Sequence, residues 1–380
     1  MKKVFLSMVA GLFIVFAMSS CGGAPAKQLT DKEILVKIYE TLNGPNWKGS
    51  QSDNWLSEKP IGEWGGVTVN DSGRVVSLRI QGDSVRGLIP AEIGGLTELE
   101  QLYIYSRSYD VANVLPAEIG ELTKLKVLGI SFYSDSKKDK PVLPNLSTLV
   151  NLETMYLSGL HGAIPENIGQ LSKLKIVQIE GFEGKIPESI CELANLEELI
   201  LRSGVEPEGE VPACIGRLSK LNSLVIDYNT GIAGDIKQPN AKFPESIWDL
   251  TNLKDLFVRT LSNTGGPIPG DKVSKMTNLK SITIIDCGFT GPIPAELFAS
   301  GKLTGLSIYK NNLTGSIPAE IGNCPDLSTV RLNQNQLTGK VPAELAKCEK
   351  LNLFDLSGNQ LSSDIPAALK VHPKFSSFKF

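Results

Sequence analysis

Side chains that could perform chemistry are few in this chain of 380 residues. Its two histidines, His161 and His372, stand too far apart for a His-Asp-Ser or Cys-His arrangement, and no spacing typical of a metal cluster or a phosphate-binding loop occurs. Aspartate and glutamate are plentiful, but no pair of carboxylates stands out. The sequence therefore predicts a protein that is not an enzyme and binds no metal or other cofactor.

The elements that position the remaining side chains are short repeats. In residues 303–345, the set Leu303, Leu306, Ile308, Asn311, Leu313 and Pro318 recurs 24 positions later as Leu327, Val330, Leu332, Asn335, Leu337 and Pro342. The pattern L-x-x-L-x-L-x-x-N-x-L with a fixed period is typical of leucine-rich repeats, in which each unit contributes a strand, a turn and a return segment. No unit can bury its own apolar face, so neighbouring units must stack.

Thirteen strands are expected from the residues that open the units: Val75, Leu99, Leu125, Leu152, Leu174, Leu196, Leu221, Leu253, Leu279, Leu303, Leu327, Leu351 and Phe375. Each repeat contains a proline at an equivalent position. The interval from this proline to the next strand is nearly constant, whereas the interval from the strand to the proline varies. Return segments must interlock, but a loop at one edge can lengthen at little cost. The predicted fold is an α/β repeat solenoid, a horseshoe with a concave parallel β-sheet of about 13 strands and an N-terminal helical cap.

Residues 1–20 have the features of a lipoprotein signal peptide. Lys2 and Lys3 precede an apolar run, and small residues stand directly before Cys21. This arrangement resembles the lipobox of bacterial lipoproteins, whose cysteine is acylated; an ordinary signal peptide cut nearby is the alternative. Two or three acyl chains on Cys21 would anchor the protein to a membrane, with residues 21–28 as a tether.

An N-terminal cap is expected over residues 29–72, before a repeat solenoid over residues 73–380. Thr30 and Glu33 form a capping box that opens an amphipathic helix ending near Leu42. Three tryptophans follow the helix: Trp47, Trp55 and Trp64. Because a solenoid needs its first core layer covered, we expect the indoles to cover it; a ligand-binding aromatic box is the alternative.

The helix, the Trp64-Gly65-Gly66-Val67 element, the G-R-V-x-x-L entry at residues 73–78 and the repeated L-x-G-x-I-P resemble the plant-type leucine-rich repeat family. That family includes receptor-kinase ectodomains, polygalacturonase-inhibiting proteins and bacterial surface lipoproteins. Plant caps usually carry a cysteine pair, which this cap region lacks. Together with the leader, this difference favours a bacterial, Bacteroidetes-like lipoprotein branch.

Five cysteines remain after Cys21, and we expect all five to be free thiols. Cys324 and Cys348 take a position that leucine holds in other repeats, so they should be buried; their equivalent places in adjacent repeats also leave a disulfide open as an alternative. Cys191 and Cys214 lie at different phases of their repeats, which argues against a bond between them.

The turn after each strand should hold an asparagine that hydrogen-bonds the backbone. That position is held by Asn229, Asn311, Asn335 and Asn359, with Asp83 and Cys287 as variants. We therefore expect a regular C-terminal third and a less regular remainder. Two insertions, residues 133–142 and 230–242, should project from one edge, either as binding loops or as solvated drift.

The last residues, 375–380, predict a thirteenth strand with no capping unit after it. Lys374 and Lys379 would discourage pairing with another chain. We therefore expect a monomer, with dimerisation through the bare end as the alternative.

In L-x-x-L-x-L the leucines point inward and the residues between them face the concave side, so stacked strands turn each outward position into a row. Tyr103, Tyr105, Phe132 and Tyr156 form an exposed aromatic cluster on three successive strands, and Gly129 leaves a gap between two rings. Grouped rings are candidate anchors for a protein, a peptide or a sugar. The alternative is the general preference of tyrosine for strands.

A second feature lies further along the same face. Glu180, Arg202, Asp227 and Arg259 alternate in sign on adjacent strands, and we expect them to pair laterally. Beside them, Ile200, Val225 and Phe257 form an apolar strip that a partner could contact with the charges as a rim. The candidate ligand-binding residues are Tyr103, Tyr105, Phe132, Tyr156, Ile200, Arg202, Val225, Asp227, Phe257 and Arg259.

Charge argues against a nucleic-acid partner, because the net charge of −3 becomes −3 − 2 = −5 without Lys2 and Lys3. The predicted function is a membrane-anchored, non-catalytic recognition module of the bacterial cell envelope, in the outer membrane, that binds a protein or peptide on its concave face and neighbouring loops. A glycan is an alternative ligand. An inhibitor of a secreted enzyme and a structural or adhesive surface protein are alternative functions.

Overall fold

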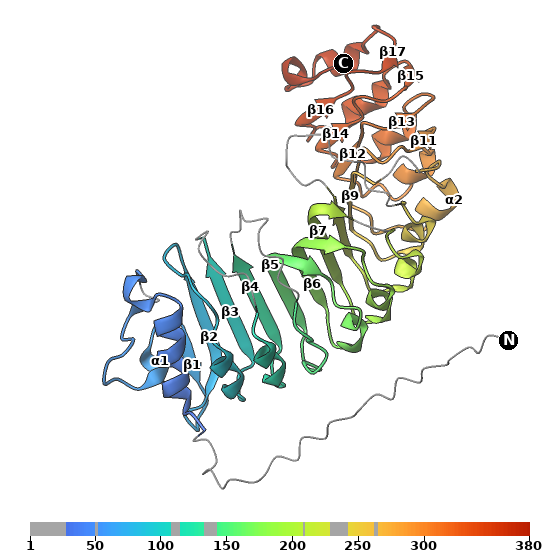
Figure 1. Ribbon diagram of the computed structural model, residues 1–380. Coiled ribbons are helices and arrows are strands. Elements are labelled where there is room, and N and C mark those ends of the chain that lie inside the picture. Colours follow the sequence, from blue (N-terminus) through green and yellow to red (C-terminus); the bar gives the residue numbers. More distant parts are fainter. Residues whose placement is uncertain are drawn as a thin grey trace, which may run out of the picture.

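The computed structural model describes residues 28–49, 52–107, 115–132, 143–207, 210–228, 242–261 and 265–380. Within these ranges, thirteen strands form one sheet along the inner side of an arc, and the 3₁₀ helices of the repeats follow the outer side (Figure 1). We call the outward face of this sheet the concave face. The leader, Cys21, residues 133–142 and nearly all of the second insertion lie outside the described residues.

The strands of the large sheet are β1 (Val67–Val69), β2 (Val75–Gly82), β3 (Gln101–Ser106), β4 (Val127–Phe132), β5 (Thr154–Ala163), β6 (Ile176–Gly184), β7 (Glu198–Pro207), β8 (Ser223–Asp227), β9 (Asp255–Arg259), β10 (Ser281–Ile285), β12 (Gly305–Tyr309), β14 (Thr329–Arg331) and β16 (Leu353–Asp355). β1 pairs antiparallel with β2. All other neighbouring strands of this sheet, from β2 to β16, pair in parallel. Two small ladders join β11 (Thr290–Gly291) to β13 (Asn312–Leu313) and β15 (Thr338–Gly339) to β17 (Gln360–Leu361).

The register of the parallel strands buries the leucines of the repeat. Leu306 of β12 is paired with Val330 of β14, and both side chains are buried. A slip of one residue would turn every such side chain to solvent, so burial fixes the register. Each large apolar side chain buried in this way contributes about 1.5–3 kcal/mol relative to leaving it exposed. The predicted solenoid fold is therefore confirmed.

Most return segments are short 3₁₀ helices that follow the proline of the repeat: η4 (Ala91–Gly95), η5 (Ala117–Glu121), η6 (Ile168–Gln170), η7 (Glu188–Glu192), η8 (Ala213–Arg217), η9 (Glu245–Asp249), η10 (Ala295–Phe298), η11 (Ala319–Asn323) and η12 (Ala343–Lys347). Two repeats instead carry the short helices α2 (Gly270–Val273) and α3 (Ala367–Lys370), and the segment after Pro144 contains only turns. Proline fixes φ near −65° and its carbonyl accepts the bond that closes the turn, as Pro90 does from Ile93 N–H at 3.1 Å. Because neighbouring return helices pack together, their length is nearly constant.

The cap is built as the sequence predicts. Helix α1 (Asp31–Thr41) begins with the Thr30–Glu33 capping box, and its apolar side chains are buried in the core. The three tryptophans are also buried: Trp47, Trp55 and Trp64. Their indole N–H groups donate to backbone carbonyl oxygens, at 2.8 Å for Trp47 and 2.9 Å for Trp55. The rings therefore cover the first core layer and are not open to a ligand.

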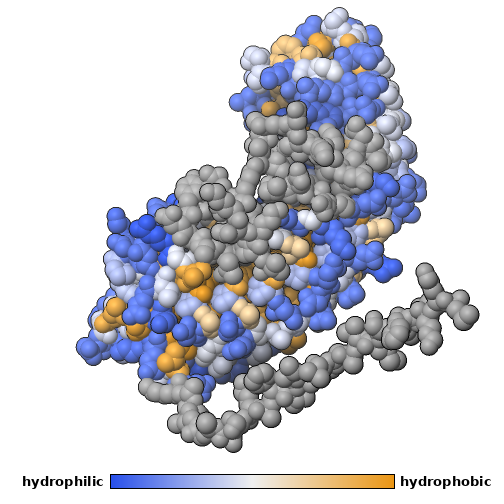
Figure 2. Space-filling model, in the orientation of Figure 1, coloured by the Kyte–Doolittle hydropathy of each residue, from blue (hydrophilic) through white to orange (hydrophobic). Residues whose placement is uncertain are grey.

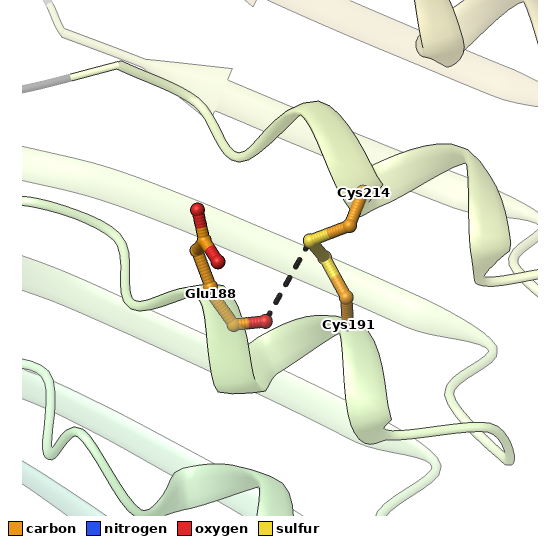
Figure 3. The surroundings of a disulfide bond; sticks show 3 residues. All are labelled: Glu188, Cys191 and Cys214. Carbon is orange, nitrogen blue, oxygen red and sulfur yellow. Dashed lines mark hydrogen bonds between the residues drawn. A yellow bond between two sulfur atoms is a disulfide. The ribbon is translucent and has the colours of Figure 1, made fainter.

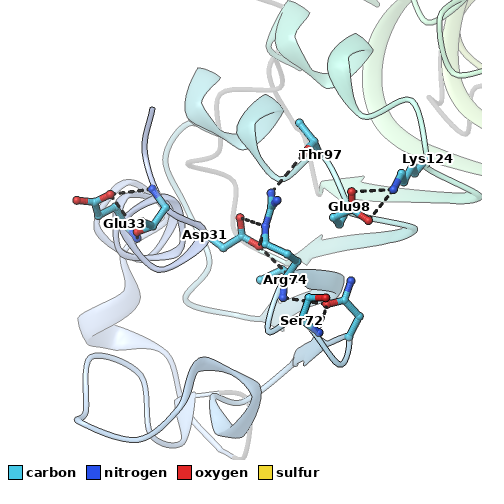
Figure 4. Close-up of polar contacts among 10 residues, drawn as sticks. Asp31, Glu33, Ser72, Arg74, Thr97, Glu98 and Lys124 are labelled. Carbon is cyan, nitrogen blue, oxygen red and sulfur yellow. Dashed lines mark hydrogen bonds and ion pairs between the residues drawn. The ribbon is translucent and has the colours of Figure 1, made fainter. Parts of the chain in front are cut away.

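An ion pair between the half-exposed Arg74 and the buried Asp31 joins the cap to the first repeat (Figure 4). Both oxygens of Asp31 accept from Arg74 Nε at 3.1 Å, and one of them also accepts from the backbone N–H of Val75 at 2.7 Å. Arg74 also donates to the Thr97 hydroxyl of the next repeat. The hydrogen bond with Asp31 raises the pKa of Arg74. The first turn of α1 is thereby fixed to the strand that opens the sheet.

The turns after the last strands contain the predicted asparagine ladder. Asn311 is buried; its Oδ1 accepts from the backbone N–H groups of Cys287 and Phe289, and its Nδ2 donates to the carbonyls of Ile284 and Tyr309. Asn335 and Asn359 make equivalent bonds, and Cys287 is buried as expected for a variant of this position. Asp83 does not join the ladder: its side chain is exposed and forms an ion pair with Arg107. Register shifts between β5 and β7 confirm the less regular middle.

Cys191 and Cys214 form a disulfide, so the prediction that they are free thiols is wrong (Figure 3). They lie in η7 and η8, which pack against each other, and their Cα atoms are 5.9 Å apart. The Cys214 sulfur lies 3.7 Å from the carbonyl oxygen of Glu188. Residues at different positions of two adjacent repeats can meet diagonally, so a difference in repeat position does not exclude a disulfide. Cys287, Cys324 and Cys348 are free and buried.

The C-terminus is not a thirteenth parallel strand; β1 supplies the thirteenth strand of the sheet instead. Residues Phe375–Ser377 form a 3₁₀ helix after the short helix α3 (Ala367–Lys370), and only Lys379 bridges to Asp355 of β16. Phe378 is buried against Phe354, with ring centroids 4.8 Å apart. The last phenylalanines therefore fold back over the final repeat, which is more favourable than a strand with one exposed face.

The asparagine ladder gives a stability prediction. Replacing Asn311 by alanine removes four hydrogen bonds and leaves buried backbone groups without partners, so the free energy of unfolding should fall by about 3 kcal/mol. The exposed neighbour Asn312 is the matched control, and its replacement by alanine should change stability by less than about 0.5 kcal/mol. Urea unfolding of both variants measures this. Equal losses at the two positions would contradict the role of the ladder.

The disulfide gives a second prediction. Changing both Cys191 and Cys214 to serine opens a loop that the bond closes across 23 residues, and unfolding free energy should fall by roughly 3 kcal/mol. A reducing agent should lower the stability of the wild type by a similar amount and leave the double variant unchanged. Alkylation of the denatured, unreduced chain should leave both residues unlabelled; labelling of either one contradicts the bond.

Candidate functional site

The strand pairing places the predicted outward residues in two continuous rows. The first row runs through Arg79, Tyr103, Gly129, Tyr156, Gln178, Ile200, Val225, Phe257, Thr283, Ser307, Arg331 and Asp355. The second runs from Gln81 through Tyr105, Ser131, Ser158, Glu180, Arg202, Asp227, Arg259 and Ile285 to Tyr309. Neighbouring positions in a row are one strand apart, about 4.8 Å.

Tyr103, Tyr105 and Tyr156, which we call the aromatic patch, lie half-buried on β3 and β5. The rings of Tyr103 and Tyr105 stack with centroids 6.1 Å apart, and the guanidinium of Arg79 lies 4.1 Å from the Tyr103 centroid. Burial and the neighbouring Tyr103 raise the pKa of Tyr105, so its hydroxyl is neutral and can donate at ordinary pH. Within the patch, Tyr103 and Tyr105 thus form a stacked pair of rings with the Arg79 guanidinium over one of them.

The gap expected at Gly129 is filled by these rings. A Cβ atom there would lie 2.7 Å from Cδ1 of Tyr103 and 2.8 Å from the hydroxyl of Tyr105. Glycine therefore lets the two tyrosines lean across β4 toward Tyr156. The structure turns the predicted slot into a continuous surface.

Phe132 does not belong to this surface, and its assignment as an exposed aromatic is wrong. Its side chain is 3% exposed. Along β4, Phe132 has the same parity as Leu128 and Ile130, which are also buried, so the alternation of the strand points all three into the core.

The alternating charges pair laterally, as predicted. Arg202 is bonded to Glu180, and Arg259 Nε donates to Asp227 Oδ1 at 2.8 Å. Asp227 is buried, so it needs this partner. Beside these pairs, Ile200, Val225 and Phe257 occupy adjacent places in the first row and stay partly exposed. We keep the name apolar strip for these three residues.

A depression of about 620 Å³ lies at the edge of the concave face, next to the aromatic patch. It is lined by Lys48, Gly49, Gln81, Gly82, Asp83, Tyr105, Ser106, Arg107 and Ser131. It is open on one side and contains no converging set of catalytic groups. Lys48 comes from the cap, and only the folded chain brings it beside Tyr105. Arg79 was not singled out from the sequence, although the repeat register places it next to Tyr103.

The described residues offer little for catalysis or for holding a metal. No group of three or more His, Cys, Asp or Glu side chains among them could hold a metal ion. Burial raises the pKa of the thiols of Cys287 and Cys348 to about 12 and about 11, so neither is a ready nucleophile. None of the helices in the described part is long and apolar enough to span a membrane.

The visible surface is mostly hydrophilic, and apolar residues reach it in small groups (Figure 2). Such groups occur in the N-terminal half and at the C-terminal tip. Val371 and Phe380 are among the exposed large apolar residues near that tip. A surface of this kind suits recognition by a few anchoring side chains within a polar surround.

Comparisons with known proteins agree with this geometry. A family model described as a leucine-rich repeat region matches residues 138–373. Over 104 residues, 26% of the chain, the sequence is 29% identical to polygalacturonase inhibitor 1 of Oryza sativa subsp. japonica and covers 30% of that protein. The chain therefore spans less than a third of the length of this relative.

Two solved structures show the likeness over a longer range. The crystal structure of PEPR1-AtPEP1 gives a TM-score of 0.66 at 27% identity, over 89% of this chain and 50% of that chain. The plant peptide hormone receptor RGFR1 in complex with RGF2 gives 0.55 at 26% identity, over 72% and 46%. The match of the family model to more than half of the sequence, on a sheet of this topology, shows that the chain belongs to the leucine-rich repeat family.

Proposed function

We propose that this protein is a non-catalytic recognition module that binds a peptide or a protein on its concave face. The observation that carries the proposal is the aromatic patch, in which stacked half-buried rings and Arg79 stand together on a rigid sheet. Rigid aromatic side chains lose little entropy on binding and are the usual anchors of protein interfaces. The likeness to a peptide hormone receptor supports the same conclusion.

The shape of the face favours a macromolecule over a small molecule. The aromatic patch and the apolar strip together extend from β3 to β9, six strand intervals or about 29 Å, and their nearest members, Tyr156 on β5 and Ile200 on β7, are about 10 Å apart. A ligand that covers both features along their full extent must be long. Beside the apolar strip lie the self-paired charges, which would exclude poor partners more than they attract a good one.

Two other functions make different use of the same scaffold. The likeness to a rice polygalacturonase inhibitor supports inhibition of a secreted enzyme, in which the partner would be a folded protein. A structural or adhesive surface protein would not depend on the aromatic patch at all. A glycan would stack on the tyrosine rings and form hydrogen bonds with the polar residues around them, without needing charges of its own.

We further propose that Cys21 carries a lipid anchor and that the protein works in the bacterial cell envelope, at the outer membrane. The leader and the small residues before Cys21 support this. The disulfide between Cys191 and Cys214 supports it independently, because such bonds persist in oxidising compartments outside the cytosol.

The aromatic patch gives the functional prediction. Changing Tyr103, Tyr105 and Tyr156 together to alanine should weaken capture of peptide or protein ligands from the organism's surroundings at least 30-fold, since an anchoring ring contributes about 2 kcal/mol or more. Gly129→Ala should weaken capture too, because its Cβ displaces two of the rings. Binding isotherms of the captured ligand measure both effects.

Tyr309 is the matched control, since it is a half-buried tyrosine on β12 that stacks with Arg331. Tyr309→Ala should leave the affinity unchanged. Circular dichroism and thermal melting establish that all variants are folded. Unchanged affinity in the triple variant would refute the concave-face assignment and favour the insertions or a structural role.

The anchor gives a separate prediction. Cys21→Ser should move the protein from the membrane fraction to the soluble fraction and abolish labelling by a radioactive fatty acid. Cys287→Ser, which changes a buried thiol, should alter neither readout. Continued membrane sedimentation of the Cys21 variant would show that the leader acts in another way.

A further inference from the structure

Charge is divided unevenly along the concave face. Each strand has a third outward residue, two positions before its residue in the first row. Strands β2–β5 therefore present twelve outward residues: Ser77, Arg79, Gln81, Gln101, Tyr103, Tyr105, Val127, Gly129, Ser131, Thr154, Tyr156 and Ser158. Arg79 is the sole charged residue among these twelve. The equivalent positions of β6–β9 contain four acids and two arginines: Glu180, Glu198, Asp227, Asp255, Arg202 and Arg259.

Among the described residues, the first part of the face has an excess of positive charge. Among the described residues, Arg79 has no ion-pair partner, since it stacks on Tyr103 instead. Lys48 borders the depression beside Tyr105 and is likewise unpaired within the described chain. The ion pair between Arg107 and Asp83 at the rim leaves this balance unchanged.

The second part has an excess of negative charge. Arg202 and Arg259 are each held by one acid of their own row, which leaves Glu198 on β7 and Asp255 on β9. Neither carboxylate has an ion-pair partner in the part of the chain that the structure describes. Glu198 on β7 is two strand intervals from Tyr156 on β5, so the negative region begins close to the aromatic patch. Burial and then this carboxylate raise the pKa of Tyr156.

We propose that the ligand is an extended peptide with segregated charge, whose acidic residues lie over Arg79 and Lys48 and whose basic residues lie over Glu198 and Asp255, with apolar or aromatic residues between them. This inference rests on the proposed function and specifies its ligand class. A neutral glycan has no charges to match these two groups, and a nucleic acid would be repelled by the second group.

The spacing gives the length of the peptide. Arg79 is five strand intervals from Glu198 and seven from Asp255, which corresponds to about 24 and 34 Å. An extended chain rises about 3.3 Å per residue, so about 7–10 residues connect the two charged groups. Exposed ion pairs are individually weak, and the four together should give about a tenfold preference for segregated over mixed charge at low salt.

The test is selection from a random 12-residue peptide library displayed on phage, against the immobilised full chain. Enriched peptides should carry acids in one half and bases in the other, in either chain direction. For three enriched sequences, a synthetic peptide and a scramble of identical composition with alternating charge are compared in 50 mM salt. The scrambles should bind at least about tenfold more weakly.

Charge reversal distinguishes a specific effect from a general one. The double variant Lys48→Glu with Arg79→Glu should lose the tenfold preference, and the double variant Glu198→Lys with Asp255→Lys should lose it as well. Lys302→Glu, an exposed charge on the return side of its repeat, should keep it. Enriched peptides with no charge pattern, or scrambles that bind equally well, overturn this inference and leave peptide recognition standing. Absence of any enriched peptide overturns this inference together with peptide recognition, whereas recognition of a folded protein is tested by the tyrosine variants above.

Discussion

The backbone ladder between adjacent repeats determines nearly everything else in this protein. Each strand pairs in parallel with the same positions of the next, as Leu306 does with Val330, and this pairing is possible only while every return segment has nearly the same length. A proline at the start of the 3₁₀ helix supplies that constancy, because its fixed φ and its carbonyl close a short turn. Burial of the leucines then opposes any slip in register.

That constraint separates stability from recognition. Inward positions must be apolar, whereas outward positions on the same strand are free to vary, so the concave face can hold tyrosines on β3, none on β4 and an apolar strip on β7–β9 without disturbing the core. The ends of the stack need separate solutions, since no neighbour covers them. Three tryptophans cover the first layer, and phenylalanines of the last residues cover the final one.

Much of the fold could be predicted from sequence because it repeats. The rows from Arg79 to Asp355 and from Gln81 to Tyr309 have the predicted register, and the asparagine ladder follows from one residue type at one position. Features that occur only once in the chain were harder to predict from the sequence. Cys191 meets Cys214 diagonally, which depends on how two 3₁₀ helices pack, and the final residues turn back because no thirteenth repeat follows them.

The assignment of Phe132 to the exposed cluster was a different kind of error, since the alternation of β4 already pointed this side chain inward. The position of Lys48 beside Tyr105 required the folded chain, because the cap lies outside the repeat pattern.

Side-chain footprinting with hydroxyl radicals, on the full chain with and without its captured ligand, tests the central claim most directly. Exposed and half-exposed rings react rapidly, and bound ones are protected. If recognition uses the concave face, oxidation should slow at Tyr103, Tyr105, Tyr156 and Phe257 and stay unchanged at Val371 near the C-terminal tip. Protection confined to the return helices on the outer side of the arc, with the tyrosines still fully reactive, would contradict the account.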